Sequence, residues 1–176
     1  GALVYGMVRG KYNYQVLRYS LTYDDLPEAF DGFQITQISD IHSGSFDNAE
    51  KVQHGIDLIN QQQSDVILFT GDLVNNVADE MLPWQNQFAT LKAPQGVFSV
   101  LGNHDYGDYY QWPSEKVKAQ NLEKLFQIQE AMGWKLLRNE NRFIERGNDR
   151  LALIGVENWG KGFKRAGDLQ KALKTI

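Results

Sequence analysis

Residues 97–105 read VFSVLGNHD, so a run of apolar residues stands directly before an amide, an imidazole and a carboxylate. A continuous apolar run of this kind is typical of a short strand buried on both faces, as in a parallel sheet. The polar residues that follow could form an ordinary turn, or they could form a site that carries chemistry. The rest of the chain has to decide between these two interpretations.

Two earlier stretches have the same design as residues 97–105. FQITQIS at 33–39 is followed by an aspartate, and VILFT at 66–70 is followed by glycine and aspartate. Both runs are rich in β-branched and aromatic residues, which favour strands. The sequence therefore predicts three buried strands, each ending at a polar motif.

Helices are expected between these strands. Asp47 and Glu50 resemble a capping box at the start of a helix over 48–62. A second, less regular helix is predicted over 79–91, with Pro83 in its first turn. The resulting order, strand-helix-strand-helix-strand, predicts a parallel sheet joined by right-handed crossovers.

The polar motifs are expected to meet at one edge of this sheet. Parallel strands point the same way, so their carboxyl ends emerge together, and ligands of open α/β folds bind there. The chain places Asp40, Asp72 and Asn103 at these three strand ends. Their convergence is the main structural prediction from the sequence.

The remaining segments have weaker patterns. Residues 12–23 alternate like an amphipathic strand, and residues 114–132 have a helical pattern that begins at a capping serine. We expect a short hairpin whose turn is at 140–141, another buried strand over 151–156, and a last helix from about residue 168.

Composition limits the class of protein. The chain has 176 residues and 42% hydrophobic residues, which suits one globular domain with a sizeable core. Its net charge of -4 argues against general nucleic-acid binding, so no nucleic-acid partner is expected. It has no cysteine, which excludes disulfides, thiolate nucleophiles and cysteine zinc sites. Any metal must be held by oxygen and nitrogen.

The first two motifs offer metal ligands. In an extended segment, residues i and i+2 point the same way, so Asp40 and His42 could hold one cation. Asp72 has two carboxylate oxygens and could bridge two cations. Taken singly, each motif is equally consistent with a polar turn. Asn75 and Asn76, which follow closely, are candidates for orienting a phosphate.

The third motif offers a ligand and a proton carrier. Asn103 supplies a neutral carbonyl oxygen, and His104 supplies an imidazole, the side chain that proteins use most often to give a proton to a leaving oxygen. Asp105 could hold the imidazole in one tautomer. The alternative is a turn or helix cap. Because all three motifs follow predicted parallel strands, their combination favours a two-metal hydrolase.

The motifs DIH at 40–42, GD at 71–72 and GNHD at 102–105 resemble those of the calcineurin-like metallophosphoesterase family. The stretch FDGFQITQISDIHSG is further similar to a membrane-associated bacterial subgroup with YkuE-like and UDP-diacylglucosamine pyrophosphohydrolase-like enzymes. The resemblance implies an α/β fold: a four-layer α/β/β/α sandwich of two mixed sheets, here truncated at its C-terminal end.

The resemblance also implies a ligand set. Asp40 and His42 would hold the first metal, Asp72 would bridge both metals, and Asn103 would hold the second. Two divalent ions are expected. Oxygen and nitrogen donors suit Mn, Fe or Zn, and Mg is also compatible.

The catalytic residues implied by the resemblance are His104 and Asp105. His104 would protonate the leaving oxygen or stabilise the transition state, and Asp105 would support it. The implied function is a metal-dependent phosphohydrolase, in which a hydroxide of the dinuclear centre attacks a phosphoester or pyrophosphate bond. The substrate would be a phosphorylated small molecule or a lipid-linked molecule.

One departure from the family pattern concerns histidines. The family has further histidines after these motifs, whereas this chain has only His42, His54 and His104, and His54 lies off the apolar stripe of its helix. We therefore expect residues 1–176 to be the N-terminal portion of a single metallophosphoesterase domain, whose C-terminal histidine-bearing part is absent. Such a fragment would have little activity. The alternative is a non-catalytic domain that binds a metal or a partner.

The expected location is bacterial, in the cytoplasm or at the membrane. Residues 1–10, GALVYGMVRG, are mildly apolar and do not begin with Met, so we expect that an upstream segment could provide membrane association.

Overall fold

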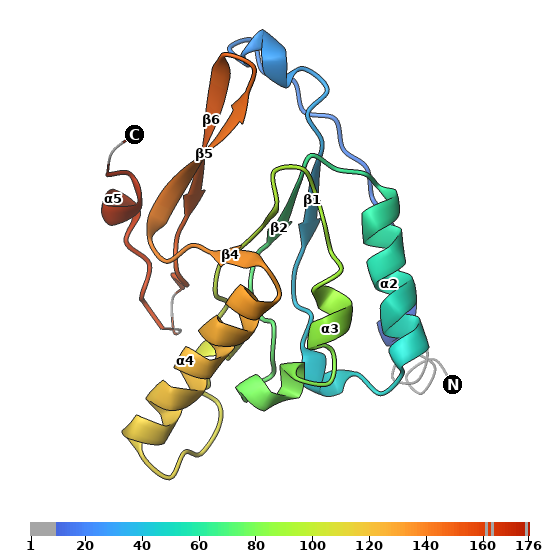
Figure 1. Cartoon of the computed structure of the whole chain (residues 1–176). Coiled ribbons are helices and arrows are strands. Elements are labelled where there is room, and N and C mark those ends of the chain that lie inside the picture. Colours follow the sequence, from blue (N-terminus) through green and yellow to red (C-terminus); the bar gives the residue numbers. More distant parts are fainter. Residues whose placement is uncertain (1–9, 161, 163, 175) are drawn as a thin grey trace.

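The computed structural model describes residues 10–160, 162, 164–174 and 176, and its centre is a four-stranded parallel sheet (Figure 1). The strands lie side by side in the order β1-β2-β3-β4. Their bounds are β1 Ile35–Ile38, β2 Val66–Phe69, β3 Val97–Ser99 and β4 Trp134–Leu136. The three strands predicted from their apolar runs are confirmed.

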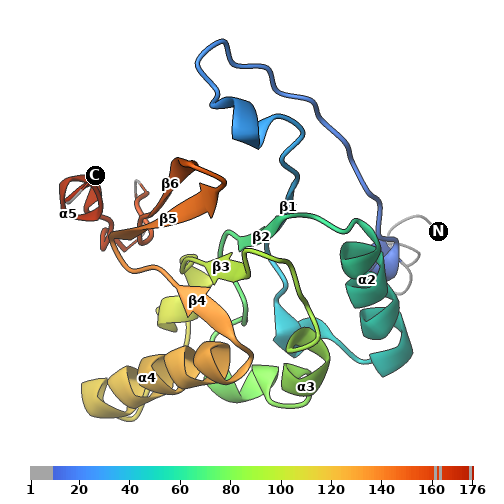
Figure 2. The ribbon, with the colours of Figure 1, turned by 45° about the horizontal axis from the view of Figure 1, so that its top comes forward.

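Helices cover one face of this sheet, and a hairpin lies on its other face (Figure 2). The helices are α2 Ala49–Gln61, α3 Gln85–Phe88 and α4 Glu115–Ala131, each between two successive strands. The hairpin is β5 Glu140–Arg146 with β6 Asp149–Gly155, followed by α5 Leu169–Ala172. Single 3-10 turns are η1 Gly10–Tyr12, η2 Glu28–Phe30, η3 Ser43–Ser45, η4 Ala78–Met81 and η5 His104–Tyr106.

The apolar composition of β2 follows from this layering. Ile67 and Phe69 belong to the core cluster shared with the helices. Val66 and Leu68 belong to a second cluster, which includes Ile144 of the hairpin. Because alternate side chains enter different cores, every position of the strand is apolar.

The predicted α/β class is confirmed. The described residues contain one purely parallel sheet and one antiparallel pair, which is consistent with the metallophosphoesterase fold. No helix among the described residues has the length and apolar character needed to cross a bilayer.

Two predicted strands were placed wrongly. Residues 13–23 form no strand, and none of the described strands pairs with them. The hairpin turns at 147–148 instead of 140–141, because β4 joins the parallel sheet and β5 pairs with β6. β6 also alternates between half-buried and exposed side chains, so it is not buried on both faces.

The helix predictions hold with local corrections. The predicted helix over 79–91 is divided into η4 and α3. The cap of α2 is Asn48, whose side chain accepts a hydrogen bond from the Lys51 amide, and not Asp47, which pairs with Lys11. Ser114 caps α4 as expected, with its hydroxyl accepting from the Val117 amide.

Candidate metal centre

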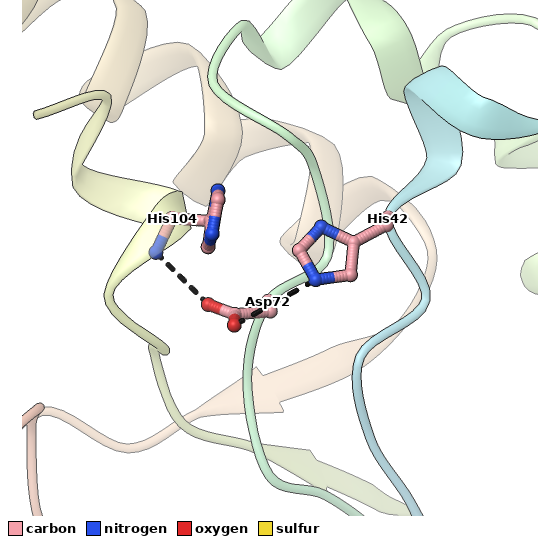
Figure 3. A group of neighbouring side chains, drawn as sticks. All are labelled: His42, Asp72 and His104. Carbon is pink, nitrogen blue, oxygen red and sulfur yellow. Dashed lines mark hydrogen bonds and ion pairs between the residues drawn. The ribbon is translucent and has the colours of Figure 1, made fainter. Parts of the chain in front are cut away.

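Three loops at the carboxyl ends of β1, β2 and β3 bring the predicted motifs together (Figure 3). The first two loops are joined by backbone hydrogen bonds that continue past the strands. Asp40 N donates to Gly71 O at 3.0 Å, His42 N donates to Asp72 O at 3.0 Å, and Ser43 N donates to Leu73 O at 3.0 Å. The position of the DIH motif is therefore set by the backbone of the GD motif.

Glycine allows the second and third loops to touch. A Cβ on Gly71 would lie 2.3 Å from Gly102 N, and Gly71 has φ +107°. A Cβ on Gly102 would lie 2.1 Å from Asp72 Oδ1 and 2.5 Å from Asp72 N. No other residue fits at either position without displacing backbone. These glycines allow His104 N to donate to Asp72 Oδ1 at 2.9 Å.

Asp105 holds the second and third loops together through hydrogen bonds to their backbone amides. Its carboxylate is fully buried and accepts from Asp72 N and Gly102 N, each at 2.9 Å, and from Leu73 N at 2.8 Å and Val74 N at 3.3 Å. Burial raises the pKa of Asp105 to about 6, against the opposing effect of these amides.

Backbone strain is concentrated at this site. Among the described residues, five that are not glycine have positive φ, and three of these are Asp40 at 53°, His42 at 45° and Asp72 at 62°. Left-handed backbone at non-glycine residues costs of order 1–3 kcal/mol each and persists where the surrounding structure holds it. The predicted extended geometry of the DIH motif is therefore wrong, although its two side chains do come together.

The side chains form a compact group of donors. His42 Nε2 lies 3.8 Å from Asp40 Oδ1 and 3.8 Å from Asp72 Oδ2. His42, Asp72 and His104 each offer a ligand atom within 4.8 Å of the others. The ring centroids of His42 and His104 lie 4.8 Å apart, with the rings at 86° to each other. Figure 3 shows both rings beside Asp72.

These spacings fit a divalent cation. Two ligands with bonds of about 2.1 Å to one ion lie at most about 4.2 Å apart, so both separations from His42 are compatible with shared coordination. No lysine or arginine of the described residues forms an ion pair with Asp40 or Asp72. Two neighbouring carboxylates without a basic partner favour binding of a cation.

The model of the calcineurin-like phosphoesterase family matches residues 33–164. This chain belongs to the calcineurin-like phosphoesterase family. It is 25% identical over 158 residues to a transmembrane protein with metallophosphoesterase domain of Danio rerio, covering 88% of this chain and 34% of that protein.

Bacterial members of the family are also similar. YkuE of Bacillus subtilis is 38% identical over 87 residues, 48% of this chain and 30% of YkuE. The UDP-2,3-diacylglucosamine pyrophosphatase LpxG of Chlamydia trachomatis is 35% identical over 89 residues, 48% of this chain and 27% of LpxG. The chain thus spans about a third of the length of these relatives.

The predicted ligands of this calcineurin-like domain differ in exposure. Asp72 is almost buried, His42 is half-buried, and the Asp40 side chain is 66% exposed. Asn103 lies in the third loop, where its Nδ2 donates to the Tyr109 hydroxyl at 2.9 Å. His54 is exposed on α2, as expected of a histidine without a role in the centre.

The predicted support of His104 by Asp105 needs correction. The carboxylate of Asp105 is occupied by backbone amides, whereas His104 Nδ1 lies 2.7 Å from the carbonyl oxygen of Asn75. The sequence indicated Asn75 only as a candidate for orienting a phosphate. The one signal in the sequence was its position three residues after Asp72, on the same loop.

Proposed function

We propose that this domain contributes the first half of a dinuclear metal centre that hydrolyses a phosphoester or pyrophosphate bond. The observation that carries the proposal is that His42, Asp72 and His104 bring donor atoms within 4.8 Å of one another at the carboxyl edge of the sheet, so that two proposed ligands lie beside the proposed proton donor. Membership of the calcineurin-like phosphoesterase family supports the reaction class.

In this proposal Asp40, His42 and Asp72 hold one cation, and Asp72 and Asn103 hold the second. When bound, the cations supply charge neutralisation for the phosphoryl oxygens and a nucleophilic water at neutral pH. Further histidines, outside the three of this chain, complete the second site. The identity of the two metals, with Mn, Fe or Zn expected and Mg also compatible, stays a prediction.

His104 is the proposed proton donor. Because its Nδ1 bonds to a backbone carbonyl, its Nε2 is the atom that can carry a second proton toward a leaving oxygen. The amide of the same residue is fixed on Asp72 Oδ1, so the ring is positioned next to the proposed bridging ligand. Asp105 acts indirectly, by holding both loops in register.

The proposed substrate is a phosphorylated small molecule or a lipid-linked molecule. The similarity to LpxG, named as a UDP-2,3-diacylglucosamine pyrophosphatase, supports including a nucleoside-diphosphate lipid among the substrates tested. Bacterial origin and association with a membrane remain predictions.

The test combines metal binding with turnover. The full-length protein, with the further histidines that complete the second site, is purified and titrated with Mn²⁺ in a calorimeter. It is then assayed on a phosphomonoester, a phosphodiester and a nucleoside-diphosphate lipid. Asp72→Asn should abolish both binding and hydrolysis, whereas His104→Asn should keep the metal and lose turnover. His54→Asn is the matched control, because its side chain is exposed on α2, and it should change neither property.

Two results would contradict this proposal. If the full-length protein, with the further histidines, binds Mn²⁺ but hydrolyses none of the three substrate types, it is a metal-binding protein and not an enzyme. Loss of metal in His104→Asn would make His104 a ligand and remove it as the proton donor.

A further inference from the structure

One asparagine contacts both histidines of the candidate centre. The side-chain oxygen of Asn75 lies 3.1 Å from His42 Nδ1, and its backbone oxygen lies 2.7 Å from His104 Nδ1. The two rings come from different loops, and the Asn75 residue lies on the loop between them in sequence. A single residue therefore contacts both imidazoles through hydrogen bonds and orients them.

The chemistry of these contacts fixes the protons. A carbonyl oxygen can only accept a hydrogen bond, so His104 must carry a proton on Nδ1. In the structure Asn75 Oδ1 faces His42 Nδ1 at 3.1 Å and accepts its hydrogen bond, while Asn75 Nδ2 lies 3.3 Å from the Ser45 hydroxyl oxygen, which is also 3.5 Å from Oδ1. A neutral ring with its proton on Nδ1 has its lone pair on Nε2. In His42 this is the atom that lies 3.8 Å from both Asp40 and Asp72.

Asn75 is itself firmly held. The Glu80 carboxylate accepts from the backbone amides of residues 75, 76 and 77, at 2.6, 3.2 and 3.0 Å. On the other side, a Cβ on Gly44 would lie 2.5 Å from the Glu80 carboxylate and 2.9 Å from Asn75 Nδ2. Asn121 also holds this loop, since its Nδ2 donates to Asn76 O at 3.2 Å and its Oδ1 accepts from Ala78 N at 2.8 Å.

We propose that Asn75 is a positioning residue that keeps the single proton of neutral His42 and of neutral His104 on Nδ1, using its side chain for one ring and its backbone for the other. Nε2 of His42 is then free to face a cation, and Nε2 of His104 is free to carry the proton for a leaving oxygen. The effect of Asn75 on metal binding rests on the proposed function, whereas the tautomers of His42 and His104 follow from the hydrogen-bond geometry alone. Partners of this kind fix the tautomer of metal-ligating histidines and change metal affinity about 10–100-fold.

The two oxygens of Asn75 give a differential test. Asn75→Ala removes the acceptor of His42 but keeps the backbone carbonyl that binds His104. Long-range nitrogen-proton NMR of the metal-free protein, at a pH where imidazoles are neutral, distinguishes a ring nitrogen that carries a proton from one that does not. The chain has three histidines, so its spectrum is simple, and exposed His54 serves as an internal reference.

In the wild type we expect His42 and His104 to carry the proton on Nδ1. In Asn75→Ala, His42 should shift toward the Nε2-protonated form while His104 is unchanged, and Mn²⁺ should bind about 10–100-fold more weakly. Asn75→Asp retains an acceptor oxygen and should restore the tautomer of His42. Asn60→Ala is the control, since it removes an asparagine with two hydrogen bonds, to Thr90 O and from Lys92 N, away from the site.

The outcomes separate this inference from the proposed function. If His42 of the wild type carries its proton on Nε2, or if Asn75→Ala leaves it on Nδ1, the positioning role is wrong even when Mn²⁺ binds. If the tautomers are as expected but the wild type binds no Mn²⁺, the positioning role stands and the proposed function fails. If Asn60→Ala loses as much Mn²⁺ affinity as Asn75→Ala, the loss comes from general destabilisation of the protein, and the inference is overturned.

Discussion

Replacing Asp105 should damage the fold more than the proposed chemistry. Its carboxylate is fully buried, and each oxygen accepts two backbone amides: Oδ2 from Asp72 and Gly102, and Oδ1 from Leu73 and Val74. Asp105→Ala would leave these amides without partners in a closed space. Asp105→Asn would be little better, because either orientation of the amide directs an NH₂ group at two backbone donors.

The magnitude follows from two opposing contributions. Each buried amide that loses its acceptor costs about 1–3 kcal/mol, so four of them give roughly 4–12 kcal/mol. Against this, the rise of the Asp105 pKa from 3.8 to about 6 means that the ionised group costs the wild type about 3 kcal/mol at pH 8. Removing that charge recovers about this amount. We expect Asp105→Ala to be destabilised by about 1–9 kcal/mol net, with about 5 kcal/mol at the middle of that range, which for a chain of this size lowers Tm by roughly 10–20 °C.

The assay is urea unfolding at pH 8 in the presence of a chelator, followed by the fluorescence of the four tryptophans. Excluding metal separates the loss of loop anchoring from a loss of ligand binding. Asp108→Ala is the control, because this carboxylate of the same loop pairs with Lys118 near the surface and should cost less than about 1 kcal/mol. A stability of Asp105→Ala within about 0.5 kcal/mol of the wild type would refute the reasoning, since the loss of four acceptors outweighs the recovered cost of the charge by about 1 kcal/mol or more.

Two further predictions concern packing and buried hydrogen bonds. Gly102→Ala should lower the stability of the fold by about 3 kcal/mol and abolish Mn²⁺ binding in calorimetry, because the new Cβ would overlap Asp72 Oδ1. The control is Gly133→Ala, whose Cβ would meet nothing within 4 Å. This variant should lose stability only by the strain energy of its φ of +79°, about 1–2 kcal/mol. Asn139→Gly should cost about 3 kcal/mol and speed hydrogen exchange of the Glu157 and Asp168 amides, because the side chain forms four hydrogen bonds with Glu157, Ala166 and Asp168. Unchanged exchange of these two amides would contradict this prediction.

The sequence predicted the sheet well because its strands are buried on both faces. Such strands have continuous apolar runs, and each run of this chain ends at a glycine or an aspartate where the strand ends. Topology then follows from the crossover rule, which places three strand ends at one edge. The convergence of Asp40, Asp72 and the GNHD loop could thus be predicted without coordinates.

The errors arose where the partner of a segment is distant in sequence. Residues 13–23 alternate like a strand, but Leu17 and Tyr19 remain 69% and 82% exposed because no described strand pairs with them. β4 was assigned to a hairpin, since nothing in its three residues indicates a parallel neighbour 37 positions earlier, where Val97 faces Trp134. The local hydrophobic pattern of a segment indicates its type of secondary structure, but it does not indicate which other segment it pairs with.

The same limit applies to the proposed centre, and it changes how the motifs should be interpreted. Ligand spacing suggested that Asp40 and His42 share a face of an extended strand, yet both have left-handed backbone. What holds them is the hydrogen bonding of their amides to the GD loop. Gly102 and Asp105 likewise contact the backbone of the GD loop or the proposed ligand Asp72. The motifs therefore encode the strained backbone that presents the donors as much as the donors themselves, and a variant that preserves the ligands but disturbs these anchors should lose metal as completely as one that removes a ligand.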